Sequence, residues 1–179
     1  MILTGPEITA AVGDGRLRIT PFDQTQVNPN SYNVCLGSTL LVYTDDVLDA
    51  HRPNLTRRMD ISAEGCVLEP GQLYLGHTVE QVGSDAFVPL LFGRSSVGRL
   101  GLFVEITAPI GDIGFHGQWT LMLSPIRPLR VYAGMKIGQI MFFVAVGPIV
   151  PYAGKYQAAE GPRPSAYWHD LPPAAVTAS

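Results

Sequence analysis

The sequence has few charged side chains and no long apolar run. Asp, Glu, Lys and Arg make up 15% of its 179 residues, and the formal net charge is −3. Proteins that bind a nucleic-acid backbone carry a clustered basic face, so this charge balance argues against a nucleic-acid partner. The apolar stretches, such as Ile137 to Val150, are interrupted by Gly, Gln and Pro, and none reaches the roughly 20 residues of a membrane span. We expect neither a nucleic-acid nor a membrane partner.

Cysteine and histidine are scarce as well, with two and four residues. Cys35 and Cys66 are too few for a disulfide framework and lack metal-ligand spacing. The histidines form no HxxxH pair and no zinc-deaminase signature, and the sequence contains no P-loop and no nucleophile elbow. The N-terminus has no basic start or cleavage site of a signal peptide. We therefore expect buried thiols, a reducing cytoplasm and no metal held by protein ligands.

Glycine and proline are abundant, with 19 and 15 residues, and they separate short apolar runs. This pattern predicts many short strands in a mainly β fold, a sandwich or a barrel-like jelly roll. Thr4 and Glu7 have capping-box spacing, which predicts one helix over residues 4–13. The clearest strand candidates are residues 33–36, 39–43, 72–78, 87–92, 118–123 and 139–144.

The chain divides into a β domain over residues 1–150 and a tail over residues 151–179, where the periodicity is lost. The tail is a candidate flap, although a solvated tail fits its composition equally well, and we expect its last six residues to be disordered. Hydrophobic residues make up 46% of the chain, which indicates that some apolar surface faces a partner subunit.

The strongest local signal is the run Gly93-Arg-Ser-Ser-Val-Gly-Arg99. Arginine forks bind phosphate oxygens bidentately, and hydroxyl and backbone N–H groups fill the remaining acceptor positions. The alternative is a turn whose arginines pair with nearby acids. A second run, residues 107–117, predicts a Gly-rich hairpin in which Asp112 orients a water or a sugar hydroxyl and Phe115 packs on a sugar. Asp112 as a simple turn cap is the alternative.

Taken in order, these runs resemble the dCTP deaminase family of bacteria and archaea, including its bifunctional deaminase–dUTPase members. The match covers nearly the whole chain and is carried by Asn30 to Gly37, Leu68 to Gly71, Leu75 to Thr78, Gly93 to Leu102, Thr107 to Phe115, Gly134 to Gln139, and Lys155 to Gln157 with Gly161 and Pro162. The resemblance implies a distorted β jelly roll of the dUTPase type. It also implies a homotrimer whose active sites lie between subunits and hold a nucleoside triphosphate with Mg²⁺.

The resemblance also assigns the candidate site. Phosphate binding and placement of the reacting water would fall to the Arg–Ser run, the base and deoxyribose to residues 108–112, and closure over the triphosphate to the tail. The candidate substrate-binding residues are Arg94, Ser95, Ser96, Arg99, Thr107, Ala108, Asp112, Phe115, Gln139, Tyr152, Lys155, Tyr156 and Gln157, and the candidate catalytic residues are Asp112, Ser95, Arg99 and Glu105.

Several departures from the family pattern bear on the reaction. Family deaminases carry a Glu that shuttles protons on the strand after the hairpin, and Met122 stands there in this chain. A thioether neither accepts nor delivers a proton, and such help is worth ~10²–10⁴ in rate. Glu105 replaces a frequent His, Asn33 replaces an Asp, and Ala159 replaces a Gln.

We therefore expect an enzyme that hydrolyses a pyrimidine nucleoside triphosphate, such as dUTP, dCTP or a modified analogue, to the monophosphate and pyrophosphate. Two alternatives stay open. The first is a dCTP deaminase that forms dUTP with a relocated acid/base, for which Glu105 is the candidate. The second is a non-catalytic nucleotide-binding homologue.

Overall fold

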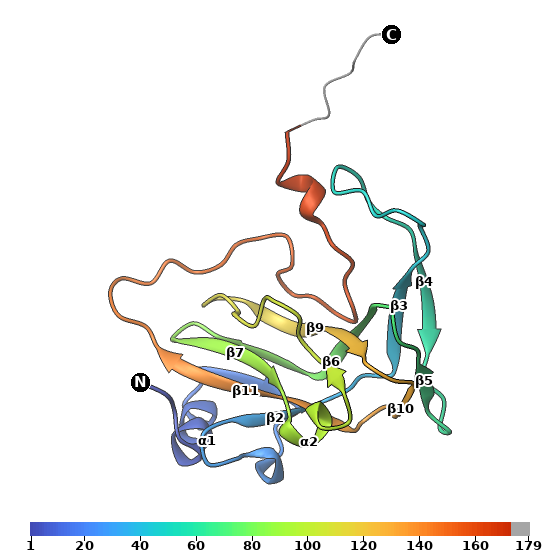
Figure 1. The fold of residues 1–179 in the computed structure, drawn as a ribbon. Coiled ribbons are helices and arrows are strands. Elements are labelled where there is room, and N and C mark those ends of the chain that lie inside the picture. Colours follow the sequence, from blue (N-terminus) through green and yellow to red (C-terminus); the bar gives the residue numbers. More distant parts are fainter. Residues whose placement is uncertain (173–179) are drawn as a thin grey trace.

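The computed structural model describes residues 1–172, and strands dominate it (Figure 1). In chain order the elements are α1 (Gly5–Gly13), β1 (Leu17–Thr20), η1 (Gln24–Gln26), β2 (Tyr32–Cys35), β3 (Thr39–Tyr43), β4 (Thr56–Asp60), β5 (Cys66–Leu68), β6 (Tyr74–Ser84), β7 (Phe87–Gly93), α2 (Ser95–Gly98), β8 (Leu102–Phe103), β9 (His116–Pro125), β10 (Leu129–Val131), β11 (Lys136–Val144) and η2 (Tyr167–His169). Each predicted strand run overlaps one of these strands. The predicted fold class, a mainly β jelly roll with a short N-terminal helix, is confirmed.

Two antiparallel sheets make up the body of the domain. The larger sheet has the order β4-β3-β6-β9-β8, with β1 paired to the second half of β6. The smaller sheet has the order β2-β11-β7, and β10 and β5 form a separate pair. In Figure 1 the β7-β11-β2 sheet lies beneath β6 and β9, and the tail passes above them.

The core lies between the two sheets. Burial alternates along β9, so that Leu121 and Leu123 are fully buried while their neighbours are half-exposed. Ile140 and Phe142 of β11 are fully buried in the same cluster. One face of β9 is therefore committed to the core, and its other face is available for a binding site.

Helix α1 begins and ends close to the predicted residues, but the predicted capping box is wrong. The Thr4 side chain makes no cap hydrogen bond, and the Glu7 carboxylate pairs with the Arg16 guanidinium at 3.0 Å. Because the cation is within reach, the carboxylate is drawn outward and does not return to the N-cap amide. The predicted disorder of the last six residues concerns positions outside the described part of the chain.

No helix within residues 1–172 is long and apolar enough to cross a membrane.

Candidate active site

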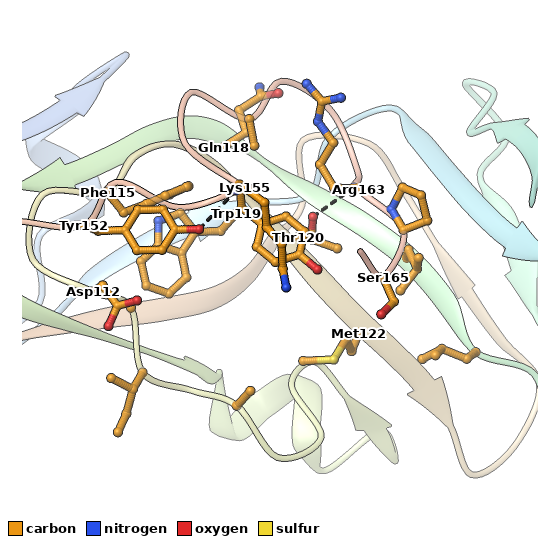
Figure 2. Close-up of a pocket in the computed structure, with 18 of the residues that line it drawn as sticks. Asp112, Phe115, Gln118, Trp119, Thr120, Met122, Tyr152, Lys155, Arg163 and Ser165 are labelled. Carbon is orange, nitrogen blue, oxygen red and sulfur yellow. Dashed lines mark hydrogen bonds between the residues drawn. The ribbon is translucent and has the colours of Figure 1, made fainter. Parts of the chain in front are cut away.

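A pocket of about 730 Å³ opens on the half-exposed face of β9 (Figure 2). Four parts of the chain line it: the end of β3 with its following loop, the region at the start of β6, residues 108–115 with β9, and the tail. Residues 108–115, called the hairpin below after the prediction, form a loop with one turn and no strand pair of their own. The lining residues are Tyr43, Leu48, Leu73, Leu75, Ala108, Ile110, Gly111, Asp112, Phe115, Gln118, Trp119, Thr120, Met122, Tyr152, Lys155, Tyr156, Ala159, Arg163, Pro164 and Ser165. A mostly apolar wall with a few polar groups is typical of a small-molecule site.

The floor of the pocket comes from alternate residues of β9. Gln118, Thr120 and Met122 all line the pocket, because successive side chains of a strand point to opposite faces. Leu75 of β6 lies directly opposite Met122 in the antiparallel register and lines the pocket as well. Met122, the residue that stands where the resemblance implies a proton-transfer group, thus lies on the floor of the pocket.

Asp112 lines the other end of the pocket, near Phe115 and Tyr152 (Figure 2). The turn that carries it is closed by the main chain, since the Phe115 N–H donates to the Asp112 carbonyl at 3.2 Å. The exposed Asp112 carboxylate is therefore not needed to close the turn. Asp112 is the one carboxylate among the described residues that line this pocket.

Two glycines allow the hairpin to approach its neighbours. A Cβ on Gly111 would lie 2.2 Å from the Trp119 ring. Gly114 has a φ of +92°, and its Cβ would lie 2.7 Å from the backbone nitrogen of Tyr152. Phe115 makes edge contacts with both aromatic rings, at centroid distances of 6.0 Å to Trp119 and 6.1 Å to Tyr152. The aromatic wall at this end therefore depends on glycine at both positions.

The tail lies along the edge of β9 and covers the pocket. The Gln118 N–H donates to the Ala159 carbonyl at 2.8 Å, and the Arg163 N–H donates to Thr120 Oγ1 at 3.0 Å. Further along, the Ser165 N–H donates to the Tyr43 hydroxyl at 2.8 Å. The tail thus bridges β9 and β3, as a closed flap over the pocket would.

The Gln157 side chain fastens the tail to the hairpin. Its Oε1 accepts a hydrogen bond from the His116 N–H at 2.8 Å, and its Nε2 donates to the Gly114 carbonyl at 2.7 Å. Both functions of the amide are used, and Gln157 is not among the residues that line the 730 Å³ pocket. In the structure, Gln157 joins the flap to the hairpin that bears Asp112.

Lys155 enters the pocket from the tail and has an acidic partner. Its ammonium group pairs with the Asp170 carboxylate, and this hydrogen bond raises the pKa of Lys155 above its ordinary value. Lys155 Nζ also lies 5.7 Å from the centre of the Tyr156 ring. The pocket therefore holds a cation whose charge is neutralised from within the tail.

The Arg–Ser run forms α2, a single helical turn that was not predicted. Arg94, Ser95, Ser96 and Arg99 are absent from the lining of the 730 Å³ pocket, and Ser95, Ser96 and Arg99 are exposed. A single chain does not bring this run together with Asp112 and Lys155.

Three other predicted residues also lie outside the pocket lining. The Glu105 carboxylate accepts a hydrogen bond from the Ala108 N–H and so closes its own turn. Gln139 finds the polar partner that its apolar surroundings require, because the Ser31 hydroxyl donates to its Oε1 at 3.0 Å. Thr107, which lies between Glu105 and Ala108 in the sequence, is exposed.

Sequence reasoning missed several lining residues. Thr120 and Gln118 share the face of Met122, so strand alternation along β9 is a signal that finds them. Tyr43, Leu75 and Ser165 reach the pocket through strand pairing and the path of the tail, for which the sequence carries no local signal.

Within residues 1–172, no group of three or more His, Cys, Asp or Glu side chains is arranged to hold a metal ion. Asp112 is the lining residue that offers carboxylate oxygens. Mg²⁺ accepts such a sparse protein contribution when nucleotide phosphates supply most of its ligands. The residues present fit a nucleotide-borne Mg²⁺ and do not form a cage of protein ligands.

Comparison with known proteins supports the resemblance. Residues 2–145 match the family model described as dCTP deaminase-like. The chain is 50% identical over 172 residues to the dCTP deaminase, dUMP-forming, of Leptospira biflexa, covering 96% of this chain and 98% of that protein. It is 47% identical over 172 residues to the protein of the same name from Clostridium acetobutylicum, covering 96% and 99%.

The crystal structure of 2′-deoxycytidine 5′-triphosphate deaminase from Agrobacterium tumefaciens is similar in fold. It superimposes with a TM-score of 0.65 at 26% identity. The match covers 80% of this chain and 48% of that chain, so this chain corresponds to about half of the solved one. By sequence and by fold, the chain belongs to the dCTP deaminase-like family.

Proposed function

We propose that the chain binds a pyrimidine deoxynucleoside triphosphate in the β9 pocket and hydrolyses it to the monophosphate and pyrophosphate. The observation that carries the proposal is the content of the pocket: it contains Asp112 and Lys155, while Met122 occupies its floor without a group that transfers protons. The name of the Leptospira relative, a dUMP-forming enzyme, supports release of the monophosphate.

In the proposed reaction Asp112 accepts a proton from the attacking water. The water oxygen bonds to the α-phosphorus while the bond from phosphorus to the bridging oxygen breaks, and pyrophosphate leaves. Lys155, once parted from Asp170, stabilises the negative charge of the phosphates. The tail hydrogen bonds along β9 hold the flap against one side of the pocket, which reduces the contact of a bound nucleotide with bulk water.

Bound together with the nucleotide, Mg²⁺ would neutralise charge on the leaving pyrophosphate. Asp112 is the lining residue able to contact it, directly or through water.

The arginines of α2 would reach the triphosphate from a neighbouring copy of the chain. Arg94 and Arg99 lie outside the pocket of their own chain, and Arg99 is exposed. A homotrimer with sites between subunits, as the resemblance implies, would place one chain's α2 beside its neighbour's pocket.

Deamination of dCTP is the second candidate, and the names of the relatives favour it more directly than hydrolysis alone. The residues that line the pocket argue against deamination. Water addition at C4 needs a group that moves a proton, and Met122 has none. Glu105 bonds to the Ala108 N–H and is not a lining residue, so the carboxylate that this chain offers its own pocket as a relocated acid/base is Asp112.

The test is an assay of purified protein with Mg²⁺ and either dCTP or dUTP, in which ammonia and pyrophosphate are followed together. We expect pyrophosphate release from the wild type, and we expect D112N to lower its rate by about 10²-fold or more. D60N, at an exposed acid on β4, is the matched control and should change nothing. Unchanged pyrophosphate release in D112N would overturn the role of Asp112.

Ammonia released from dCTP by the wild type would instead establish the deaminase candidate. Met122→Glu returns a carboxylate to the floor of the pocket. If this variant gains ammonia release that the wild type lacks, the scaffold binds dCTP and the proton-transfer group was the missing part. If the wild type binds nucleotides and forms neither product, the chain is a non-catalytic homologue.

A further inference from the structure

We propose that the end of the pocket around Met122 is an apolar subsite that selects a pyrimidine base with an alkyl group at C5, such as 5-methylcytosine or thymine, over the unsubstituted base. The proposal rests on the proposed function, because it names the substrate class of the same site. It depends on how charge and apolar surface are distributed along the pocket.

The floor at this end is built from three neighbouring strands and carries no charge. Met122 of β9 lies opposite Leu75 of β6, and Leu75 lies opposite Leu41 of β3. Tyr43 lies two residues after Leu41 on β3, so it shares that face of the sheet, and it lines the pocket. Leu73, directly before β6, lines the pocket as well. Paired residues of adjacent strands point to one side, which makes this floor a continuous apolar surface.

The tail completes this end from above. Pro164 and Ser165 line the pocket, and the Ser165 N–H donates to the Tyr43 hydroxyl at 2.8 Å. Figure 2 shows Ser165 close to Met122 in this view and Asp112 at the opposite side. The closed flap therefore covers the apolar floor with a proline ring, and its polar groups on either side of the ring are Ser165 and Arg163.

The charged lining residues come from other parts of the chain than the strands of this floor. Asp112 belongs to the hairpin, and Lys155 and Arg163 belong to the tail, where Arg163 directly precedes Pro164. None of the lining residues contributed by β3, its loop or the start of β6 is charged. A nucleotide that enters this pocket gains most when its phosphates lie near the cations and its least polar edge lies on the Met122 floor.

A methyl group at C5 fits such a floor. Each buried methylene-sized group is worth roughly 10–200-fold in discrimination in a hydrophobic enzyme pocket. An exocyclic polar group placed there would lose its water without gaining a partner. Met122 fits this role well, because an unbranched thioether adapts its shape to an apolar substituent.

The test compares matched nucleotide pairs that differ in the C5 methyl: dCTP with 5-methyl-dCTP, and dUTP with dTTP. Initial rates of pyrophosphate release give kcat/KM for each. We expect the methylated member of each pair to have a kcat/KM at least about tenfold higher. Equal or lower values for the methylated members would overturn the subsite.

Two variants at Met122 distinguish the effect of side-chain polarity from the effect of side-chain shape. Met122→Leu keeps the surface apolar and should keep the preference for the methylated nucleotides. Met122→Gln has a side chain of similar length that is polar, and it should bring the kcat/KM of the methylated and unmethylated nucleotides to about the same value. Met141→Gln on β11, a half-buried methionine of the other sheet, is the matched control and should retain the wild-type preference. Thermal melts of all three variants report whether each has folded.

Binding constants measured by calorimetry with the same four nucleotides separate this proposal from the proposed function. A preference for the methylated nucleotides in Kd without any pyrophosphate release would support the subsite and refute the hydrolysis. Pyrophosphate release with no preference would refute the subsite and leave the hydrolysis standing. Neither binding nor release would refute both.

Discussion

Lys155 shows how a single ion pair can compete with a ligand. Its ammonium group pairs with Asp170 of its own tail, and Asp170 is about half-exposed. An anionic ligand that uses Lys155 must first separate this pair. Exposed pairs contribute little free energy, so the competition would weaken nucleotide binding by no more than roughly fivefold.

We therefore expect Asp170→Asn to lower the KM for the nucleotide by about two- to fivefold. Lys155→Met should raise the KM, since the cation itself is lost. Steady-state kinetics of pyrophosphate release, with Asp60→Asn as control, measure both effects. A higher KM in Asp170→Asn would mean that the pair holds the flap closed and does not compete with the ligand.

At the level of single elements, the junction between the hairpin and the tail is the most constrained. Gly114 has a positive φ, and a Cβ there would meet Pro151 and Tyr152 at 2.7 Å. The Tyr152 N–H also donates to the Ile113 carbonyl at 2.7 Å. A side chain at position 114 would push the tail off the hairpin and strain the turn at once.

Gly114→Ala should destabilise the fold by about 1–3 kcal/mol and impair flap closure. We expect a lower melting temperature and faster proteolytic cleavage of the tail. Gly13→Ala in α1 is the matched control: its Cβ meets nothing within 4 Å, and alanine suits a helix better than glycine. A tail that stays equally protected in Gly114→Ala would show that closure tolerates the added methyl.

The elements differ in how far the sequence predicts them. The alternation of β9 is a local pattern, and the structure has it. The predicted Gly-rich hairpin at Asp112 is a loop closed by a turn, because no strand forms between β8 and β9. The helical turn of α2 was missed because four residues are too few for a periodic signal. The contact of Ser165 with Tyr43 spans 122 residues of sequence, and local propensity carries no information on such a pairing.

The same limit applies to the candidate site. Asp112 and Lys155 were predicted from a local motif and a family resemblance, and both line the pocket. Gln157 was predicted to bind substrate, but its amide bonds to the His116 N–H and the Gly114 carbonyl. Whether a polar side chain contacts a ligand or another part of the chain depends on tertiary packing, which the motif does not encode.

Across the whole molecule, large apolar side chains remain exposed around β8. Leu100, Phe103 and Ile126 are 59%, 56% and 61% exposed. The Gly101 backbone packs beside Ile126, and β8 follows α2 directly, so this apolar surface adjoins the Arg–Ser run. An apolar surface beside this run, for which we propose phosphate binding, fits a subunit interface that brings α2 to a neighbouring pocket.

We expect the protein to be a trimer in solution, measured by light scattering after size-exclusion chromatography. Phe103→Arg should dissociate the trimer and abolish pyrophosphate release together. Val146→Arg, at a fully exposed valine after β11, is the matched control and should do neither. A wild-type monomer with full activity would contradict an intersubunit site.

The path of the tail also places a tryptophan on it, so that movement of the tail can be followed by intrinsic fluorescence. The sequence has two tryptophans: Trp119 is buried on β9, and Trp168 lies on the tail with its indole stacked on the His169 ring at a centroid distance of 3.6 Å. In a Trp119→Phe protein the remaining tryptophan fluorescence would come from Trp168 alone, and an adjacent imidazole quenches indole emission. Stopped-flow mixing with nucleotide would then follow the movement of the flap in real time, without an attached dye.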